Sequence, residues 1–321
     1  MPDLVTVFGG SGFIGAQIVR ALARRGARIR VAVRQPHLAH AMRLMGDVGQ
    51  VEVVQANVRD PGSVARAADG SDAVVNLVGL LFETGRQTFQ AVHVDAARTL
   101  AEAASAVGAR MVQMSALGAD PASGSRYART KAGGEAAVRE VLPSAVILRP
   151  SIVFGPGDDF FNTYAEMAVV SPFLPLIGGG RTRFQPVFVG DVARAAAAVT
   201  LESQHAGRTF ELGGPGVFTF REILDLIQKE TGRRRLYAPL PFSVASLVGT
   251  LCTPLALTPM APPLTADQVE LLKVDNVVSG QFPGLADLGV APETVEAILP
   301  TYLYRFRRGG QFAGASGGVA A

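Results

Sequence analysis

Three glycines at positions 9, 12 and 15 follow a short apolar run at residues 4–8, and this combination limits the folds open to the chain. The run is rich in β-branched residues, which favours a buried parallel strand. Apolar residues then recur at helical spacing from Ile14 to Leu22, so the glycines lie where a strand turns into a helix. Such a turn directs free N–H groups and the positive end of a helix dipole at one point, which suits a diphosphate. The spacing therefore predicts a dinucleotide site at Gly9, Gly12, Phe13, Ile14 and Gly15.

Composition narrows the class of protein. The chain has 321 residues, 48% of them hydrophobic, which is enough for one large domain or two small ones. The formal net charge is +3 and no basic run exceeds residues 233–235, so no nucleic-acid partner is expected. Cys252 is the only cysteine, which excludes an internal disulfide and fits a reducing compartment. The four histidines are scattered, so no metal site is expected.

Apolar runs and helical patterns alternate through the first half of the chain. After the first helix, further strands are expected at residues 29–33, 51–55, 73–79, 111–114 and 145–148. A long helix is expected over residues 87–107. This alternation predicts an α/β fold, a Rossmann-type doubly wound parallel sheet with helices on both faces.

The chain divides by this pattern into two parts. Residues 1–150 are expected to form a dinucleotide-binding domain, to which residues 186–202 return. Residues 151–185 and 203–308 are expected to form a smaller C-terminal α/β region for a substrate or for docking. The glycine-rich residues 309–321 are expected to form a flexible tail.

Two positions at strand ends bear on the cofactor. Arg34 follows the second strand, where an acidic residue would bind the ribose hydroxyls of NAD and an arginine pairs with a 2′-phosphate. Arg34 therefore favours NADP(H), with NAD(H) as the alternative. Asn57 follows the third strand, and its amide offers both a donor and an acceptor to the edge of an adenine.

A serine, a tyrosine and a lysine form the candidate catalytic group. Tyr127 and Lys131 give Tyr-x-x-x-Lys, one turn apart on a predicted helix, and Ser115 ends the fifth strand. A tyrosine with its ordinary pKa of about 10 is a poor acid or base at neutral pH, but a nearby ammonium is expected to lower that pKa. The phenol could then exchange a proton with a carbonyl or alcohol while a nicotinamide exchanges hydride. Ser115 would position the reacting oxygen.

These motifs together resemble the extended or atypical short-chain dehydrogenases. Three further runs are similar to one branch of that superfamily: Arg-Pro-Ser-Ile-Val-Phe-Gly at residues 149–155, Leu-Thr-x-Asp-Gln-Val at residues 264–269 and Asp-Asn-Val-Val at residues 275–278. The branch contains the NADPH-binding accessory subunit of respiratory complex I and its bacterial relatives. The resemblance implies a nucleotide held for structure or sensing. It also implies that Val58 packs on adenine and that the cofactor contacts Gly9, Gly12, Gly15, Arg34, Tyr127 and Lys131.

Two functions stay open. The first is an NADP(H)-binding protein that stabilises or regulates a quinone-linked membrane assembly. The second is an active oxidoreductase or epimerase that uses Ser115, Tyr127 and Lys131 on a small hydroxyl or carbonyl compound or on a quinone-like substrate. The first strand begins at about Leu4, which leaves no room for a leader peptide, and no apolar run reaches spanning length, so a cytoplasmic location is expected.

Residues 236–266 are the least ordinary segment. They contain six prolines and no charged residue, which argues against a spanning helix, although residues 242–251 fit a short apolar helix. One interpretation is a hairpin packed on the smaller region. The other is a surface that docks on a respiratory complex or a membrane, and this would place the protein at the inner face of the cytoplasmic membrane.

Overall fold

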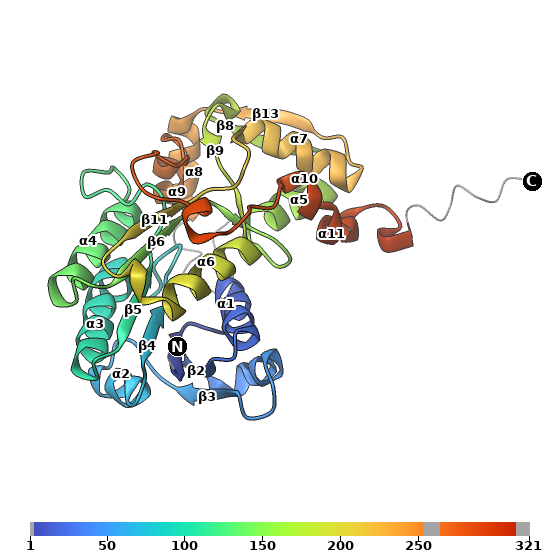
Figure 1. The fold of residues 1–321 in the computed structure, drawn as a ribbon. Helices are drawn as coiled ribbons and strands as arrows, with labels where there is room; N and C mark the ends of the chain where they lie inside the picture. Colours follow the sequence, from blue (N-terminus) through green and yellow to red (C-terminus); the bar gives the residue numbers. More distant parts are fainter. Residues whose placement is uncertain (1–2, 253–263, 313–321) are drawn as a thin grey trace, which may run out of the picture.

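The computed structural model describes residues 3–252 and 264–312 (Figure 1). A seven-stranded sheet lies at the centre, in the order β11-β6-β5-β4-β1-β2-β3, and every neighbouring pair is parallel. The strands are β1 (Leu4–Phe8), β2 (Arg28–Val33), β3 (Val51–Gln55), β4 (Ala73–Asn76), β5 (Arg110–Met114), β6 (Val146–Pro150) and β11 (Thr209–Leu212). The predicted doubly wound sheet is confirmed.

Helices cover both faces of this sheet. One face carries α1 (Phe13–Arg24) and α6 (Val189–Leu201), and the other carries α2 (Pro61–Ala68), α3 (Ala96–Ala106) and α4 (Arg126–Val141). Successive strand side chains point to opposite faces, so Val7 belongs to the core under α1 and Phe8 to the core under α3. The chain order reverses between β1 and β4, which marks their carboxyl ends as the ligand-binding edge.

Most segments after β6 build a third core around aromatic residues such as Phe161 and Phe220. Helix α6 and strand β11 do not, because they pack in the core of the central sheet, so β11 lies outside the smaller region in which residues 203–308 are expected. Its strands pair as β7 (Val153–Phe154) with β10 (Val187–Phe188), β8 (Phe173–Ile177) with β13 (Leu236–Leu240), and β9 (Arg183–Phe184) with β12 (Phe218–Thr219). Its helices are α5 (Phe160–Val170), α7 (Phe220–Thr231), α8 (Phe242–Cys252), α9 (Ala266–Leu271), α10 (Val295–Ile298) and α11 (Pro300–Leu303).

Short helical turns complete the described chain. They are η1 (Pro36–Leu38), η2 (His40–Met45), η3 (Gln90–Asp95), η4 (Gly178–Gly180), η5 (Ser203–His205), η7 (Ala286–Leu288), η8 (Tyr304–Phe306) and η9 (Gly310–Phe312). Helix α8 matches the short apolar helix that the sequence predicts. The expected flexible tail lies outside the described residues from position 313 onward, and so do residues 253–263 of the charge-free segment. Among the described helices, none has both the length and the apolar character needed to cross a bilayer.

Candidate functional site

The glycine turn sits between β1 and α1. Gly9 adopts the left-handed φ of +78°, and a Cβ atom at position 15 would lie 2.5 Å from the Gly9 carbonyl oxygen, so α1 lies directly against the turn. Gly12 is the N-cap of α1 and offers no side chain to cap it. Within the described chain, the N–H groups of Phe13 and Ile14 find no protein acceptor. Free N–H groups at a helix start fit the diphosphate of a dinucleotide.

The predicted adenosine-side residues lie at the ends of β2 and β3. Arg34 is exposed, and its Nη1 donates to Gln87 Oε1 at 2.6 Å. The Asn57 N–H donates to Ser63 Oγ at 3.0 Å, and Asn57 Oδ1 accepts from the Arg59 N–H at 3.2 Å. Val58 is buried. Arg34 and Asn57 thus flank the edge at which a dinucleotide would place its adenosine.

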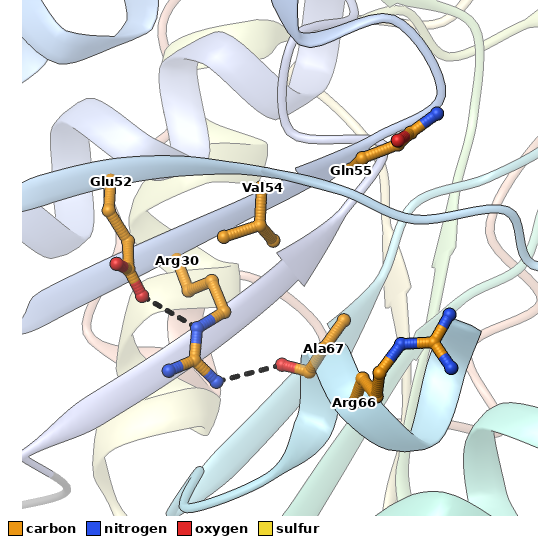
Figure 2. Close-up of a pocket in the computed structure, with 6 residues that line it drawn as sticks. All are labelled: Arg30, Glu52, Val54, Gln55, Arg66 and Ala67. Carbon is orange, nitrogen blue, oxygen red and sulfur yellow. Dashed lines mark hydrogen bonds and ion pairs between the residues drawn. The ribbon is translucent and has the colours of Figure 1, made fainter. Parts of the chain in front are cut away.

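Two surface hollows lie elsewhere. One of about 240 Å³ is lined by Arg30, Glu52, Val54, Gln55, Arg66 and Ala67 (Figure 2). The other, of about 480 Å³, is lined by Asp225, Gln228, Lys229, Gly232 and Arg234. In the first, Arg30 already donates to Glu52 at 2.6 Å and to the Ala67 carbonyl at 2.9 Å. Neither hollow contains a predicted catalytic residue, and no group of metal-ligating side chains is found in residues 3–252 and 264–312.

Helix α4 brings Tyr127 and Lys131 together. Lys131 Nζ lies 5.7 Å from the centre of the Tyr127 ring and donates to the Met114 carbonyl at the end of β5 at 3.3 Å. The Tyr127 hydroxyl has no protein hydrogen-bond partner among the described residues. Lys131 thus lies beside the Tyr127 ring at the end of β5, in the neighbourhood that the Tyr-x-x-x-Lys spacing predicts.

The electrostatics of this pair differ from the expectation. Burial raises the pKa of Tyr127 to about 12. Burial also lowers the pKa of Lys131 to about 8, opposed by the nearby charge of Glu135. The pKa of Tyr127 is therefore raised above its ordinary value, opposite to the direction expected from a neighbouring ammonium, because burial disfavours the phenolate.

Ser115 is held by a different partner. Its buried hydroxyl donates to the carboxylate of Glu135. Glu135 also accepts from Arg149 Nε at 2.9 Å and from Arg149 Nη2 at 2.6 Å. This paired contact is a charge-assisted bond of high geometric specificity. The structure thus ties Ser115 into an ion pair between α4 and β6 instead of a hydrogen bond with Tyr127.

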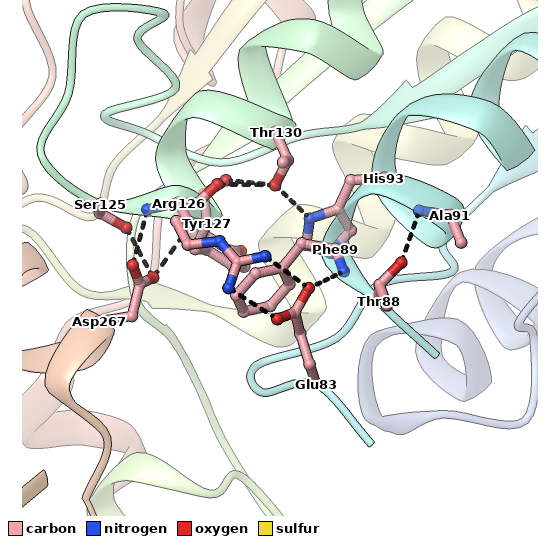
Figure 3. Close-up of polar contacts among 10 residues, drawn as sticks. All are labelled: Glu83, Thr88, Phe89, Ala91, His93, Ser125, Arg126, Tyr127, Thr130 and Asp267. Atoms are coloured by element: carbon pink, nitrogen blue, oxygen red, sulfur yellow. Dashed lines mark hydrogen bonds and ion pairs between the residues drawn. The ribbon is translucent and has the colours of Figure 1, made fainter. Parts of the chain in front are cut away.

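A histidine that the sequence analysis did not single out stands beside Tyr127. The His93 ring lies 5.4 Å from the Tyr127 ring and stacks on Phe89 at 5.3 Å (Figure 3). His93 Nε2 accepts from the Leu80 N–H at 3.0 Å, so its Nδ1 donates to Thr130 Oγ1 at 3.0 Å. Burial and the neighbouring Lys131 lower the pKa of His93 to about 3, which keeps the ring neutral.

His93 lies on η3, a π-helix that interrupts the predicted helix over residues 87–107. Helix α4 approaches η3 so closely that a Cβ atom at position 134 would overlap the His93 carbonyl oxygen. The signal in the sequence was the pair Gly133-Gly134 inside a helical pattern. Glycine destabilises the interior of a helix relative to alanine. A glycine inside a helical pattern therefore indicates a packing reason, such as the close approach of another backbone.

Helix α9 caps the helix that carries Tyr127. The Asp267 carboxylate accepts from the N–H of Arg126 at 2.6 Å, from the N–H of Tyr127 at 3.1 Å and from Ser125 Oγ at 2.8 Å (Figure 3). An anion here satisfies free N–H groups and complements the helix dipole. Asp267, in the run at residues 264–269, therefore stabilises the start of the helix that carries Tyr127.

On its other side, α4 is fastened to the loop before η3. Glu83 forms an ion pair with Arg126 at 2.9 Å and accepts from the Phe89 N–H at 2.8 Å (Figure 3). The third family-like run, residues 275–278, makes contacts within the smaller region and with the segment that follows β6. Asp275 pairs with Arg183 at 2.8 Å, and Asn276 Oδ1 accepts from Ser151 Oγ at 2.7 Å.

Comparisons with known proteins bear on this site. A model of the NAD dependent epimerase/dehydratase family matches residues 5–213. The mitochondrial NADH dehydrogenase (ubiquinone) 1 alpha subcomplex subunit 9 of Mus musculus is 36% identical over 309 residues, covering 95% of this chain and 80% of that protein. Ceramide reductase of Caulobacter vibrioides is 37% identical over 195 residues, covering 61% of this chain and 60% of that protein. An NADPH-dependent quinone oxidoreductase of Escherichia coli has the same fold, with a TM-score of 0.68 and 20% identity over 92% of this chain and 98% of that one.

Proposed function

Because this chain belongs to the NAD dependent epimerase/dehydratase family, in the branch of the alpha subcomplex subunit 9 proteins, we propose that it holds NADP(H) as a resident group. In this proposal the nucleotide serves the structure or regulation of a quinone-linked respiratory assembly. The chain offers the diphosphate turn at Gly9, Gly12 and Gly15, with Lys131 beside the nicotinamide end. When bound, the nucleotide would supply hydride chemistry, but the residues around it favour retention over turnover.

The observation that carries this proposal is the bond from Ser115 to Glu135. A reductase of this type needs a hydroxyl beside the tyrosine to orient the reacting oxygen. Here that hydroxyl is buried and donates to Glu135, whose carboxylate is ion-paired with Arg149. The pKa of Tyr127, raised to about 12, further weakens it as a proton donor at neutral pH.

Arg34 supports NADP(H) over NAD(H). It stands at the end of β2 with no carboxylate paired to it among the described residues, which suits a 2′-phosphate. Arg34→Asp should therefore weaken NADPH binding far more than NADH binding. Equal losses for both nucleotides would remove Arg34 from this role.

Helix α8 supports a docking partner. Its exposed side chains Val244, Leu247, Val248 and Leu251 recur at helical spacing, with 38% to 70% of their surface in contact with solvent. Leu236 and Phe173, paired on β13 and β8, are exposed as well. Large exposed apolar side chains that gather on one element are typical of interfaces. The proposed occupant is a membrane-bound respiratory complex, which would hold the protein peripherally on the inner face of the cytoplasmic membrane.

This docking is tested by recovery with membranes. The double variant Leu247→Glu with Leu251→Glu should be recovered with membranes less than the parent protein, because charged side chains on α8 oppose its burial in an interface. Leu44→Glu is a matched control, since Leu44 is 85% exposed on η2. Equal recovery of the double variant and the control would contradict docking through α8.

An active oxidoreductase is the second candidate, favoured by the adjacent Tyr127 and Lys131 and by the partial similarity to a ceramide reductase. One experiment separates the two functions. NADPH oxidation is followed with a short-chain quinone and with keto lipids, in the parent protein and in Tyr127→Phe. The resident-cofactor proposal expects the same background rate in both proteins. Turnover that disappears in Tyr127→Phe would establish the enzyme instead.

A further inference from the structure

Two arginines from different strand ends converge on one hairpin turn. Arg34 follows β2 and donates to the side chain of Gln87 at 2.6 Å. Arg59 follows β3 and donates from Nη1 to the carbonyl of Arg86 at 3.1 Å. The two guanidinium groups are thus anchored on consecutive residues of the same turn. This places both of them at the carboxyl edge of β2 and β3, the adenosine side of the site.

The turn that holds them is closed on itself. The Thr84 N–H donates to the Gln87 carbonyl at 3.0 Å, and the Gln87 N–H donates to the Thr84 carbonyl at 2.9 Å. Gly85 supplies the positive φ, +54°, that the tight turn needs. Glu83, just before the turn, is fixed by Arg126 at 2.9 Å. The platform beneath the two arginines is therefore ordered by its own contacts.

Neither the Arg34 nor the Arg59 guanidinium has a carboxylate partner within residues 3–252 and 264–312. Arg30, on β2, differs because it has one. Arg30 on β2 pairs with Glu52 at 2.6 Å, and its Nη1 donates to the carbonyls of Ala67 at 2.9 Å and Asp69 at 2.7 Å. Figure 2 shows the contacts with Glu52 and Ala67. Arg34 and Arg59 are exposed, and each donates one hydrogen bond to an uncharged oxygen, on Gln87 and Arg86 respectively. A guanidinium has five donors, so both retain several for an anion.

We propose that Arg34 and Arg59 together form the site for the 2′-phosphate of NADP(H), with the hairpin Thr84–Gln87 as the platform that holds both guanidinium groups. The inference rests on the proposed binding of NADP(H) and adds Arg59 as a determinant of specificity. A phosphate monoester carries up to two negative charges and several acceptor oxygens, which two guanidinium groups match better than one. NADH, which lacks this group, gains nothing from Arg59.

The test is equilibrium binding of NADPH, NADH and adenosine 2′,5′-bisphosphate to protein freed of nucleotide. Arg59→Gln should weaken NADPH and the bisphosphate about tenfold or more, because a charge-assisted contact is lost, and leave NADH unchanged. Arg66→Gln is the matched control, since Arg66 is exposed on the neighbouring α2. Circular dichroism on Arg59→Gln verifies that the fold is kept.

The outcomes separate this inference from the function beneath it. If Arg34→Gln loses NADPH selectivity while Arg59→Gln keeps it, the paired site is wrong and the NADP(H) proposal stands. If Arg59→Gln weakens NADPH and NADH equally, Arg59 supports the turn and does not read the phosphate. If the parent protein binds neither nucleotide, the NADP(H) proposal fails and the paired site fails with it.

Discussion

The Asp267 carboxylate accepts a hydrogen bond from the Tyr127 N–H at 3.1 Å, although the two residues are 140 positions apart in the chain. Through this contact, α9 of the smaller region fixes the first turn of the helix that carries the Tyr127–Lys131 pair. α9 in turn packs against α8, where a Cβ atom at Gly249 would lie 2.5 Å from the Ala266 nitrogen. Helix α8, with its exposed apolar side chains, is therefore connected through α9 to the helix that carries Tyr127 and Lys131.

Removing this cap should loosen the site. Asp267→Ala leaves the N–H groups of Arg126 and Tyr127 without their acceptor, so the free energy of unfolding should fall by about 1–2 kcal/mol. NADPH affinity should fall as well. Urea denaturation and nucleotide titration measure both effects. Glu270→Gln, on the same helix in an exposed pair with Lys273, should change the stability by less than about 1 kcal/mol. A loss of the same size in both variants would contradict a specific cap.

The close approach of α4 to η3 gives a second prediction with a matched pair of glycines. Gly134→Ala places a methyl group on the His93 carbonyl, so it should lower stability by roughly 2–4 kcal/mol. Gly133→Ala meets only the Val94 side chain at 3.2 Å and gains helix propensity, so its effect should be small or stabilising. Thermal unfolding of the two variants decides the matter, and equal losses would contradict the contact.

His93 makes stability depend on pH. Its pKa is lowered to about 3 in the folded protein, against an ordinary value of 6.5. Between these values the unfolded chain binds one more proton, so stability falls as the pH falls, by about 1.4 kcal/mol per pH unit. His93→Asn should flatten this acid limb in denaturation curves recorded from pH 7 to pH 4, while replacing the exposed His37 by Asn should not. A slope unchanged by His93→Asn would contradict a buried neutral ring.

The ion pair between Glu83 and Arg126 should slow nucleotide release, because it fastens the loop that leads into the hairpin Thr84–Gln87. Glu83→Gln removes the charge from a pair that is partly exposed, so release should accelerate about two- to fivefold. Stopped-flow displacement of NADPH measures the rate. Glu140→Gln breaks the exposed pair with Arg98 and serves as control. Equal release rates in the two variants would exclude the loop from retention.

Much of this architecture could be predicted from local patterns. The glycine turn, the parallel sheet and the neighbouring Tyr127 and Lys131 depend on residues close in sequence, and the resemblance to the complex I accessory subunit family is confirmed. The sequence could not show where the Ser115 hydroxyl points. That direction depends on Glu135 from α4 and Arg149 from β6, which meet only in the folded protein.

The remaining differences have the same origin. The pKa of Tyr127 depends on how deeply α4 buries it, which the spacing to Lys131 does not reveal. The π-helix η3 covers only 6 residues, so its wider turn is too short to appear in the apolar pattern of the sequence. The cap on Tyr127 comes from Asp267, far along the chain, so the run at residues 264–269 could be noticed in the sequence but its contact with α4 could not.

The most direct test of the central claim is the rate at which NADPH leaves the protein. The protein is purified without added nucleotide, and the fluorescence of any bound NADPH is followed after dilution into a trap. A resident structural cofactor predicts protein that arrives already loaded and releases NADPH over hours. Protein that arrives empty, or that releases NADPH within seconds, would contradict the account and point to an exchanging cosubstrate.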